Sequence, residues 1–452
     1  MSRSRAAIIL AAGQGTRMKS KTVKLLHSVG GRSMLAWAVD LAQSCGATDI
    51  VTIWGAHSPA VQQTAQSLGT KTALQDPPLG TGHAVLAARE ALSGVAGDAI
   101  VLYADTPLIT AETVERVFAA LAAGASVAVL GFEPEDPAAY GRLILDEAGN
   151  LDRIVEFKDA GEAEQQVRLV NSGVLAAPAP LLLELLGEVG NDNANGEYYL
   201  TDVVGLARGR GLRTVVVKAD ADEVLGVNSR IDLAAAEAAF QARMRRQAML
   251  DGVTLIAPET VFFSYDTRIA RDVTIEPNVV FGPGVTIEED AVIHAFSHLE
   301  GAHVRAGATV GPFARLRPGT DLGEGAKVGN FVEVKKSQLG EGAKVSHLTY
   351  IGDASIGAHA NIGAGTITCN YDGYDKHLTV VGEGAFIGSN TCLVAPVRIG
   401  AGAFTGSGTV VTEDVPEDAL ALARNPQTIK PGWAARFRTA KQARKAKKEN
   451  PS

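Results

Sequence analysis

An aliphatic or aromatic residue recurs at almost every sixth position between residues 269 and 411. An α-helix repeats near 3.6 residues and a strand in an ordinary sheet near 2, so neither explains this spacing. Short strands joined by tight corners do explain it, because three of them form one coil of a parallel β-helix. The register slips near 299–304 and 334–339 and is interrupted at 363–380. The recurring residues, which should form the inner wall of this solenoid, are Ile269, Ile275, Phe281, Ile287, Ile293, Leu299, Val304, Val310, Leu316, Leu322, Val328, Val334, Leu339, Val345, Ile351, Ile356, Ile362, Val381, Ile387, Leu393, Ile399 and Val411, with Thr405 between the last two.

Residues 1–228 follow a different pattern, in which apolar strand-like runs alternate with helical stretches rich in Ala and Leu. This alternation predicts an α/β, Rossmann-like domain with a mostly parallel sheet and helices on both faces. Ligands of such sheets bind beyond the carboxyl ends of the strands. The expected strands are 6–10, 49–54, 99–103, 126–130 and 213–218, and the expected helices are 33–44, 83–92 and 111–123.

The rest of the chain divides into three parts. Residues 229–248 contain no Gly or Pro and are rich in Ala, Glu and Arg, so 229–250 should be a helical linker. The β-helix is expected over 251–432. Residues 433–452 carry seven Lys and Arg side chains. This segment is expected to be a flexible, solvated basic tail rather than an anion site.

Composition narrows the class of protein. The net charge of −8 argues against a nucleic-acid partner. No apolar run approaches the ~20 residues of a membrane span, and the N-terminal apolar stretch runs directly into a glycine loop, unlike a signal peptide. Cys45, Cys369 and Cys392 lack the spacing of a metal or disulfide framework and fit a reducing compartment. We therefore expect a cytoplasmic protein with no membrane and no nucleic-acid partner.

The first expected strand ends in a glycine loop, Gly13-Gln14-Gly15. Backbone N–H groups in such a loop can approach a phosphate, and a following helix would add its dipole. A dinucleotide fingerprint would need a third glycine at Met18, and a Walker motif would need Gly-Lys-Ser/Thr, so this loop matches neither. On its own the loop is either a tight turn or a phosphate cradle. Arg17 and Lys24 favour the cradle because they supply positive charge.

Together with motifs further along the chain, this loop resembles the signature of the sugar-phosphate nucleotidyltransferases. The motifs occur in order through nearly all of residues 6–230. The resemblance implies transfer of a nucleotidyl group to a sugar phosphate with release of pyrophosphate. The motifs are Leu10-Ala11-Ala12-Gly13-Gln14-Gly15-Thr16-Arg17-Met18, Lys24, Gln75, Gly80-Thr81-Gly82-His83, Tyr103-Ala104-Asp105, Tyr140-Gly141-Arg142, Ile154-Val155-Glu156, Asn171-Ser172-Gly173 and Gly226-Val227-Asn228.

The same resemblance assigns residues to Mg²⁺ and to the nucleotide sugar. Asp105 and Asn228 would hold Mg²⁺, a hard cation that suits carboxylate and amide oxygens. Arg17 and Lys24 would act as catalytic cations that clamp the triphosphate. Ala104 adds a methyl group where the family usually has Gly, and Val23 stands where it usually has Pro. The UDP-sugar residues would be Leu10, Ala11, Ala12, Gly13, Lys24, Gln75, Gly80, Thr81, Tyr103, Ala104 and Asp105 around the nucleotide, and Gly141, Glu156, Asn171 and Asn228 around the sugar and metal.

The solenoid carries polar residues between 315 and 377 that a purely structural β-helix does not need. Glu333 and Lys335 are two apart on one short strand and should point the same way. The interruption at 363–380 should form a loop over a binding surface. Four other histidines, His294, His298, His303 and His359, are expected to be ordinary core or surface residues.

Over residues 251–432 these features resemble the acetyltransferase half of the bifunctional bacterial enzymes that make UDP-N-acetylglucosamine. That family implies a left-handed, trimeric β-helix in which neighbouring subunits build each acetyl site. It also implies glucosamine-1-phosphate and acetyl-CoA as substrates. The resemblance is carried by RLRPG at 315–319, GNFVEVKKS at 329–337, SHLTYIGDASIG at 346–357, NIGAGTITCNYDG at 361–373, FIGSN at 386–390 and LVAPV at 393–397.

The resemblance makes His347 the general base, and an imidazole is suited to this work near neutral pH. We infer Glu333 as the residue that orients it. Cys369 and Cys392 are expected to be packing residues, because aminolysis of a thioester needs no enzyme thiol. Arg317 and Lys335 would bind the sugar phosphate, Tyr350 and Asn361 the sugar, and Ala364, Asn370, Tyr371, Ser389, Ser407 and Arg424 acetyl-CoA, with Ser407 standing where the family often has Ala.

The expected function is therefore two reactions in one chain. The C-terminal domain would acetylate glucosamine-1-phosphate, and the N-terminal domain would transfer UMP from UTP to the product, with Mg²⁺. One rival is a nucleotidyltransferase with a single activity and a regulatory or oligomerising β-helix. Another is a solenoid used only for assembly. His347, Lys335 and the Asn370-Tyr371 pair argue against the first rival. The second rival would not need the ordered polar set from 315 to 377.

Overall fold

The computed structural model describes residues 4–137 and 139–449. The chain divides into two compact units. One contains the chain up to Thr267 together with Phe281–Gly284, and the other contains Arg268–Val280 and the chain from Val285 onward. Within the described residues, no helix is long and apolar enough to cross a membrane.

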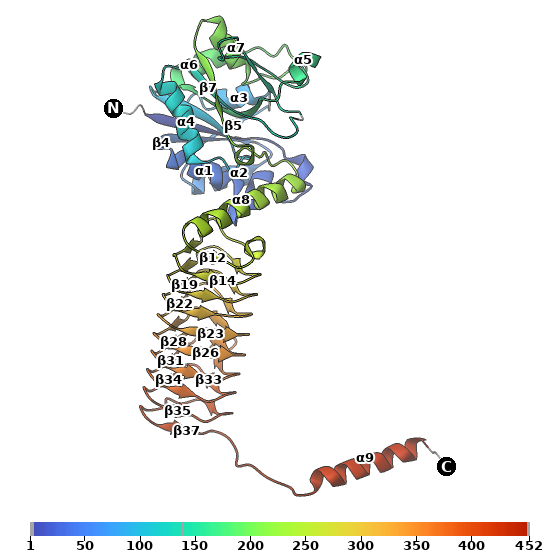
Figure 1. The fold of residues 1–452 in the computed structure, drawn as a ribbon, viewed down its shortest axis with the longest axis vertical. Helices are drawn as coiled ribbons and strands as arrows, with labels where there is room; N and C mark the ends of the chain where they lie inside the picture. The colour runs from blue at the N-terminus through green and yellow to red at the C-terminus, as the bar shows by residue number, and fades with distance from the viewer. Residues whose placement is uncertain (1–3, 138, 450–452) are drawn as a thin grey trace. The chain divides into compact units, whose positions relative to one another are not determined.

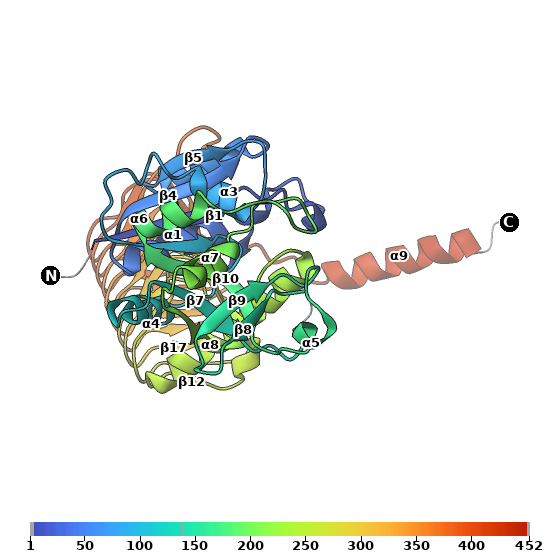
Figure 2. The same cartoon turned by 90° about the horizontal axis from the view of Figure 1, so that it is seen from above.

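The first unit is built on a nine-stranded sheet with the main order β11-β7-β10-β6-β1-β4-β5 (Figure 2). Neighbouring strands are parallel except around β10, which runs antiparallel to both β6 and β7. The hairpin of β8 and β9 extends the sheet beside β10. The strands are β1 Arg5–Ala11, β4 Ala47–Gly55, β5 Lys71–Gln75, β6 Asp98–Tyr103, β7 Val127–Phe132, β8 Arg142–Leu145, β9 Leu151–Val155, β10 Val170–Pro178 and β11 Thr214–Lys218, with a separate small pair β2 Ser28–Val29 and β3 Arg32–Ser33.

Helices cover both faces of this sheet, as the alternation predicted. Alternate residues of β1 enter opposite cores: Ala7 and Ile9 pack with α1, α2 and α4, whereas Ala6 and Ile8 pack with α3, α6 and α7. The helices are α1 Met34–Ser44, α2 Pro59–Ser67, α3 Thr81–Leu86, α4 Ala111–Ala122, α5 Glu162–Gln165, α6 Ala179–Leu186 and α7 Asp202–Gly209. Beyond the expected strands, the structure adds β5, β8, β9 and β10, and helix α3 is shorter than the expected 83–92.

The expected linker forms helix α8, Arg230–Leu250. A capping box begins it, because the Ser229 side chain accepts from the Asp232 N–H and the Asp232 carboxylate accepts from the Ser229 N–H. The side chain of buried Gln241 exchanges two hydrogen bonds with the backbone of Phe263, at 2.7 and 2.8 Å. These bonds tie the helix to the residues that follow it, near β12 Thr254–Leu255 and η4 Pro258–Thr260.

The second unit is a parallel β-helix whose coils stack one strand on the next in three sheets (Figure 1). Every residue of the predicted inner wall in this unit is buried except Ile269, which is partly exposed. Sheet I contains β14 Thr274–Ile275, β17 Val292–Ile293, β20 Thr309–Val310, β23 Lys327–Asn330, β26 Lys344–His347, β29 Asn361–Ile362, β32 Phe386–Ile387, β35 Phe404–Thr405 and β37 Leu420–Ala421. Sheet II contains β13 Arg268–Ile269, β16 Thr286–Ile287, β19 Ala302–Val304, β22 Thr320–Leu322, β25 Gln338–Leu339, β28 Ala354–Ile356, β31 Thr379–Val381 and β34 Val397–Ile399. Sheet III contains β15 Val280–Phe281, β18 His298–Leu299, β21 Arg315–Leu316, β24 Glu333–Lys335, β27 Tyr350–Gly352, β30 Ile367–Cys369, β33 Cys392–Val394 and β36 Val410–Val411.

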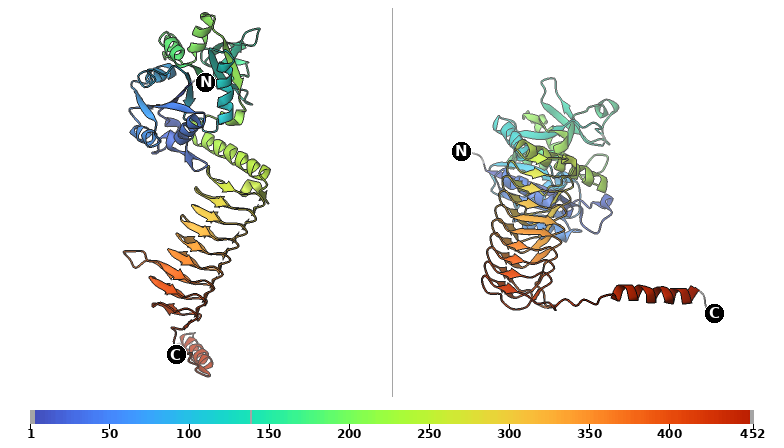
Figure 3. Two further views of the ribbon diagram at one scale, coloured as in Figure 1. Left: turned by 90° about the vertical axis from the view of Figure 1, so that its left-hand side faces the viewer. Right: turned by 60° about the horizontal axis from the view of Figure 1, so that its bottom comes forward.

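The interruption of the repeat forms a loop that leaves the stack after β30 and returns at β31 (Figure 3). It is internally braced, because the Asp372 carboxylate accepts from the N–H groups of Tyr374 and Asp375 and pairs with His377 at 2.8 Å. Past the last coil, residues 433–449 form helix α9, Trp433–Glu449, where the sequence suggested a flexible tail. The helix is consistent with a segment rich in Ala, Lys and Arg, which are strong helix formers.

Candidate functional site

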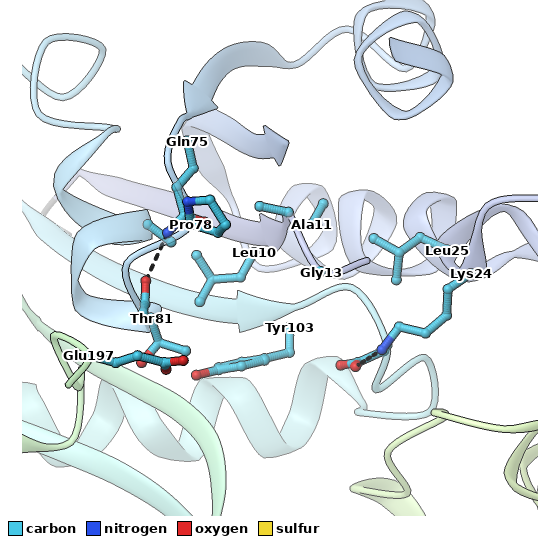
Figure 4. A pocket seen from close by; sticks show the side chains of 14 residues that line it. Leu10, Ala11, Gly13, Lys24, Leu25, Gln75, Pro78, Thr81, Tyr103 and Glu197 are labelled. Carbon is cyan, nitrogen blue, oxygen red and sulfur yellow. Dashed lines mark hydrogen bonds and ion pairs between the residues drawn. The ribbon is translucent and has the colours of Figure 1, made fainter. Parts of the chain in front are cut away.

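A cavity of about 300 Å³ opens at the carboxyl edge of the first sheet. The loop after β1, the end of β5 and the end of β6 all reach this edge, because β1, β4, β5 and β6 are parallel. Ten predicted nucleotide residues line it: Leu10, Ala11, Ala12, Gly13, Lys24, Gln75, Gly80, Thr81, Tyr103 and Asp105 (Figure 4).

The glycine loop is a turn that accommodates Lys24. Gly15 has a left-handed backbone with φ 62°, and a Cβ there would lie 2.6 Å from the Cβ of Lys24. The turn continues as the 3₁₀ segments η1 Thr16–Met18 and η2 Lys24–Leu26. The expected helix dipole behind the loop is therefore absent, since no α-helix begins there before α1. A phosphate bound at this loop would therefore be contacted by the loop N–H groups and by Lys24, without a helix dipole.

Lys24 is the centre of a compact polar cluster beside the cavity. Lys24 is 8% exposed, and its Nζ donates to Asp105 Oδ2 at 2.6 Å and to Asn228 Oδ1 at 3.1 Å. Asp105 follows β6 and Asn228 precedes α8, so residues far apart in sequence converge on one cation. In Figure 4 the Lys24 side chain points towards the carboxylate with which it pairs.

The same two oxygens fit a divalent cation. They are hard oxygen donors that already face one positive charge, which is the chemistry that Mg²⁺ requires. Among the described residues no cluster of three or more His, Cys, Asp and Glu side chains is positioned to hold a metal. A Mg²⁺ ion held by Asp105 and Asn228 would therefore take its other ligands from water and substrate phosphates, as this ion commonly does.

Tyr103 connects the cavity to the predicted sugar residues. A Cβ on Gly173 would lie 2.6 Å from its ring, so the backbone after Asn171 runs against it. Burial raises the pKa of the Tyr103 hydroxyl, which therefore stays neutral. Asn171 N–H donates to the carbonyl of Gly141 at 2.8 Å. A Cβ on Gly141 would lie 3.3 Å from the Glu156 carboxylate, and burial raises the pKa of that carboxyl.

Six predicted residues do not line the cavity: Arg17, Ala104, Gly141, Glu156, Asn171 and Asn228. Arg17 is exposed on η1, and Ala104 is fully buried in the core beneath the sheet edge, where its methyl group packs. Conversely, Pro78 and Glu197 line the cavity and were not predicted. Glu197 comes from the loop between α6 and α7, which is fastened by the bond from the Tyr198 N–H to the Leu79 carbonyl at 2.9 Å. No pattern around Glu197 marks it in the sequence, because only this long-range packing brings it to the site.

In the second unit, the repeat places the predicted general base and three predicted acetyl-CoA residues in a single column, together with Asn330, which was not predicted as a site residue. Asn330, His347, Ala364, Ser389 and Ser407 each lie two residues after an inner-wall residue of sheet I, in successive coils. The backbone bonds along this corner link the coils: Asn390 N–H donates to Ala364 O at 2.7 Å, and Gly408 N–H donates to Ser389 O at 2.8 Å. Arg424 donates to Ser407 O, which places its guanidinium at the end of the column. The column is therefore a continuous corner along which an elongated ligand could lie.

His347 is oriented by Asn330 and not by Glu333. Its Nδ1 lies 2.6 Å from Asn330 Oδ1, and the two residues are register partners in β26 and β23. With the amide oxygen as acceptor, Nδ1 carries the proton and Nε2 keeps a lone pair. The expected Glu333 pairing was wrong because Glu333 is on β24 of sheet III, whereas His347 ends a strand of sheet I.

Glu333 instead belongs to a charged group on the outer face of sheet III. It accepts from Arg317 at 2.8 Å, and Tyr350 is its register partner on β27. Lys335 is beside it on β24, and Lys376 from the loop lies against Lys335. Contact with the Lys376 ammonium lowers the pKa of Lys335. Two ammonium groups and a guanidinium gathered in this way favour an anion.

Lys376 was missed from the sequence. It is 41 positions from Lys335 in a loop, and the bridge between Tyr371 and Lys376 turns it back towards the stack. Asn370 anchors the start of this loop, since its Nδ2 donates to Asp353 Oδ2. Tyr371 is exposed, and Asn361 lies on β29 of sheet I. The structure therefore gathers the predicted acetyl-transfer residues around one corner, one outer face and one loop.

Comparisons with known proteins match both the α/β unit and the β-helix. The MobA-like NTP transferase domain matches residues 7–166, and the six-repeat bacterial transferase hexapeptide matches residues 266–301 and 378–413. The bifunctional protein GlmU of Maricaulis maris is 80% identical over 450 residues, covering 100% of each chain. The bifunctional protein GlmU of Azorhizobium caulinodans is 56% identical and covers 97% of this chain and 98% of the relative. The bifunctional protein GlmU of Caulobacter vibrioides is 57% identical and covers 99% of this chain and 97% of the relative.

The chain is a bifunctional transferase with a left-handed β-helix. This class is defined by a nucleotidyltransferase sheet with its cavity, followed in sequence by hexapeptide coils that form three parallel sheets. Its substrates include nucleotides. This chain belongs to the GlmU family of bifunctional proteins.

Proposed function

We propose that the chain acetylates glucosamine-1-phosphate with acetyl-CoA in its β-helix and transfers UMP from UTP to the product in its first unit. The products would be UDP-N-acetylglucosamine and pyrophosphate. The observation that carries this proposal is the presence of two separate polar constellations in one chain, one around Lys24 and one around His347. We further propose functional boundaries at 1–228, 229–250, 251–432 and 433–452.

In the nucleotidyl reaction, an oxygen of the sugar phosphate attacks the α-phosphorus of UTP and pyrophosphate leaves. Lys24 and the N–H groups after Leu10 would neutralise and orient the phosphates, while Gln75 and Tyr103 border the nucleotide. Mg²⁺, when held by Asp105 and Asn228, would neutralise charge on the phosphates. Gly141, Glu156 and Asn171 would bind the sugar. Arg17, exposed on η1, could act only at the outer end of the triphosphate.

In the acetyl reaction, His347 Nε2 would take a proton from the substrate ammonium. The freed amine attacks the thioester carbonyl, the C–S bond breaks, and the imidazolium protonates the leaving CoA thiolate. The second proton of the nitrogen then passes to the regenerated imidazole and on to solvent, leaving the neutral amide. Arg317, Lys335 and Lys376 would hold the sugar phosphate, with Tyr350 and Asn361 on the sugar. Acetyl-CoA would lie along Ala364, Asn370, Tyr371, Ser389, Ser407 and Arg424.

The direct test is to run both assays on the unmodified protein. We expect release of the CoA thiol from acetyl-CoA only when glucosamine-1-phosphate is present. We also expect Mg²⁺-dependent release of pyrophosphate from UTP with N-acetylglucosamine-1-phosphate. Nucleotidyl transfer without any acetyl transfer would instead support a single-activity enzyme with a regulatory β-helix.

We also propose a homotrimer formed through the β-helix. Phe296, Phe313, Phe331 and Leu348 each lie three residues after an inner-wall residue and form an exposed ladder, with exposed fractions of 46% to 63%. The phenylalanine rings stack at 4.9 and 5.2 Å. Such an ordered apolar strip is typical of a protein interface. Phe331 follows Asn330 and Leu348 follows His347, so association along the ladder would bring a neighbouring chain to the general base.

Replacing Phe313 and Phe331 together by Lys should therefore break the trimer. Charge on a desolvated strip opposes association, so sedimentation should show a fall from three chains to one. Acetyl transfer should fall with it, while nucleotidyl transfer should persist. The control is Leu145→Lys, which changes an exposed leucine of the first unit. A double variant that remains trimeric would exclude the ladder as the interface.

Lys376→Met should weaken binding of glucosamine-1-phosphate and change its pH dependence. We expect the KM of this substrate to rise by roughly tenfold, because one charge-assisted contact is lost. In the unmodified enzyme Lys376 lowers the pKa of Lys335, so Lys335 loses its charge at lower pH than an isolated lysine. Removing Lys376 should move the alkaline limb of kcat/KM to higher pH. Lys344→Met, at an exposed lysine, serves as the control. If the alkaline limb of kcat/KM stayed at the same pH in Lys376→Met, Lys376 would not belong to the phosphate site.

A further inference from the structure

Two of the three cysteines lie side by side on the outer face of the β-helix. Cys369 ends β30 and Cys392 begins β33, the next strand of sheet III. Both are free and partly exposed, whereas Cys45 is buried in the first unit. The inward residues of these strands are Thr368 and Leu393, so both thiols point outward.

The register sets the relation between the two thiols. Cys392 is the register partner of Ile367, and Cys369 is that of Val394. The cysteines are therefore diagonal neighbours, and diagonal Cα atoms in sheets lie about 7–8 Å apart, beyond ordinary disulfide geometry. Both side chains are on the outer face of sheet III, and the Cys369 thiol is in hydrogen-bonding reach of the Cys392 side chain. The pKa of the Cys369 thiol is raised mainly by burial and further by the neighbouring Cys392 sulfur. Cys369 is thus a protonated thiol and not an activated nucleophile.

We propose that Cys369 and Cys392 form a binding site for a soft monovalent cation such as Cu⁺, held by the two sulfurs. Thiolates are the ligands that soft cations select, and two of them suffice for a linear site. Zn²⁺ would need further protein ligands, and the described residues include no group of three or more His, Cys, Asp and Glu there. Binding breaks both S–H bonds, forms two metal–sulfur bonds and releases about two protons, so affinity rises with pH.

The site would also control the acetyl reaction. Cys369 directly precedes Asn370, and Cys392 follows Ser389 by three positions. An ion that draws the two sulfurs together would distort the start of the loop at Asn370 and the corner at Ser389. Acetyl transfer should therefore be inhibited while nucleotidyl transfer is unchanged. This second part rests on the proposed function, whereas the binding site does not.

Ag⁺ in chloride-free buffer serves as the probe, measured by titration calorimetry and native mass spectrometry of the full chain. We expect one tightly bound ion per chain, and an affinity at least about tenfold lower in either Cys369→Ser or Cys392→Ser. Cys45→Ser should bind like the unmodified protein. Zn²⁺ should not compete. Ag⁺ at one equivalent should inhibit acetyl transfer in the unmodified enzyme but not in the two serine variants.

Equal Ag⁺ affinity in either serine variant would overturn the site, as would equally tight Zn²⁺ binding. Ready formation of a Cys369–Cys392 disulfide by a mild oxidant would show a redox pair instead. Ag⁺ binding by both thiols without loss of acetyl transfer would overturn the control of the reaction. If the unmodified enzyme has no acetyl transfer at all, the proposed function fails, and the calorimetry still decides the site.

Discussion

Replacing His347 by Ala is expected to lower kcat for acetyl transfer by roughly 10²- to 10⁴-fold, the usual contribution of a general base. Nε2 of His347 is the basic atom that the column presents, because Asn330 engages Nδ1. Release of the CoA thiol measures the loss. Pyrophosphate release should be unchanged, since the nucleotidyl cavity is built entirely from the other unit.

Two further variants make this result specific. His359→Ala removes an exposed histidine from a corner of the same β-helix and should have little effect on either activity. Asn330→Ala keeps the imidazole but removes its partner, so it should reduce acetyl transfer less than His347→Ala does. If His347→Ala were as active as the His359 variant, another group would be the base. Loss of both activities in a folded His347 variant would contradict two independent sites.

Replacing Asp105 by Asn should reduce nucleotidyl transfer by at least about 10²-fold and raise the Mg²⁺ concentration needed for half-maximal rate. The change keeps the side-chain volume but removes the charge that faces Lys24 at 2.6 Å. Pyrophosphate release across a Mg²⁺ titration measures both effects. Acetyl transfer should be unaffected.

Asp49→Asn is the matched control, because Asp49 is a carboxylate of the same unit that pairs with Lys71 at 2.8 Å, away from the cavity. It should retain full nucleotidyl activity. An Asp105→Asn enzyme with normal rate and normal Mg²⁺ dependence would remove Asp105 from the metal site. The ion would then have to be held by other groups.

The two sites differ in how much of their geometry the sequence predicts. In the β-helix, a six-residue period converts sequence spacing directly into position, so His347, Ala364, Ser389 and Ser407 are recognisable as one column from their offsets. Even so, the partner of His347 was misassigned. Glu333 is nearer in sequence than Asn330, but it lies on a different sheet, and only strand pairing decides which neighbour faces the imidazole.

In the first unit the decisive contacts join residues far apart in sequence. Lys24 meets Asp105 and Asn228, which are 81 and 204 positions away. Glu197 reaches the cavity through a loop with no motif of its own. The glycine loop was expected to lead into a helix, but it continues as a 3₁₀ turn around Lys24. Family resemblance assigned residues to this site, whereas local sequence pattern could not give their arrangement.

By itself, the sequence determined the period of the coils, the alternation of the α/β unit and the chemical types present at both sites, because these are properties of neighbouring residues and of composition. Only the tertiary structure decided that Asn330 orients His347, that Lys376 joins Lys335, and that Cys369 and Cys392 meet as diagonal neighbours. The physical reason is that stacking of coils and return of loops set these contacts. A repeat of six specifies which side chains point inward, while the pairing of one coil with the next decides which outward groups touch.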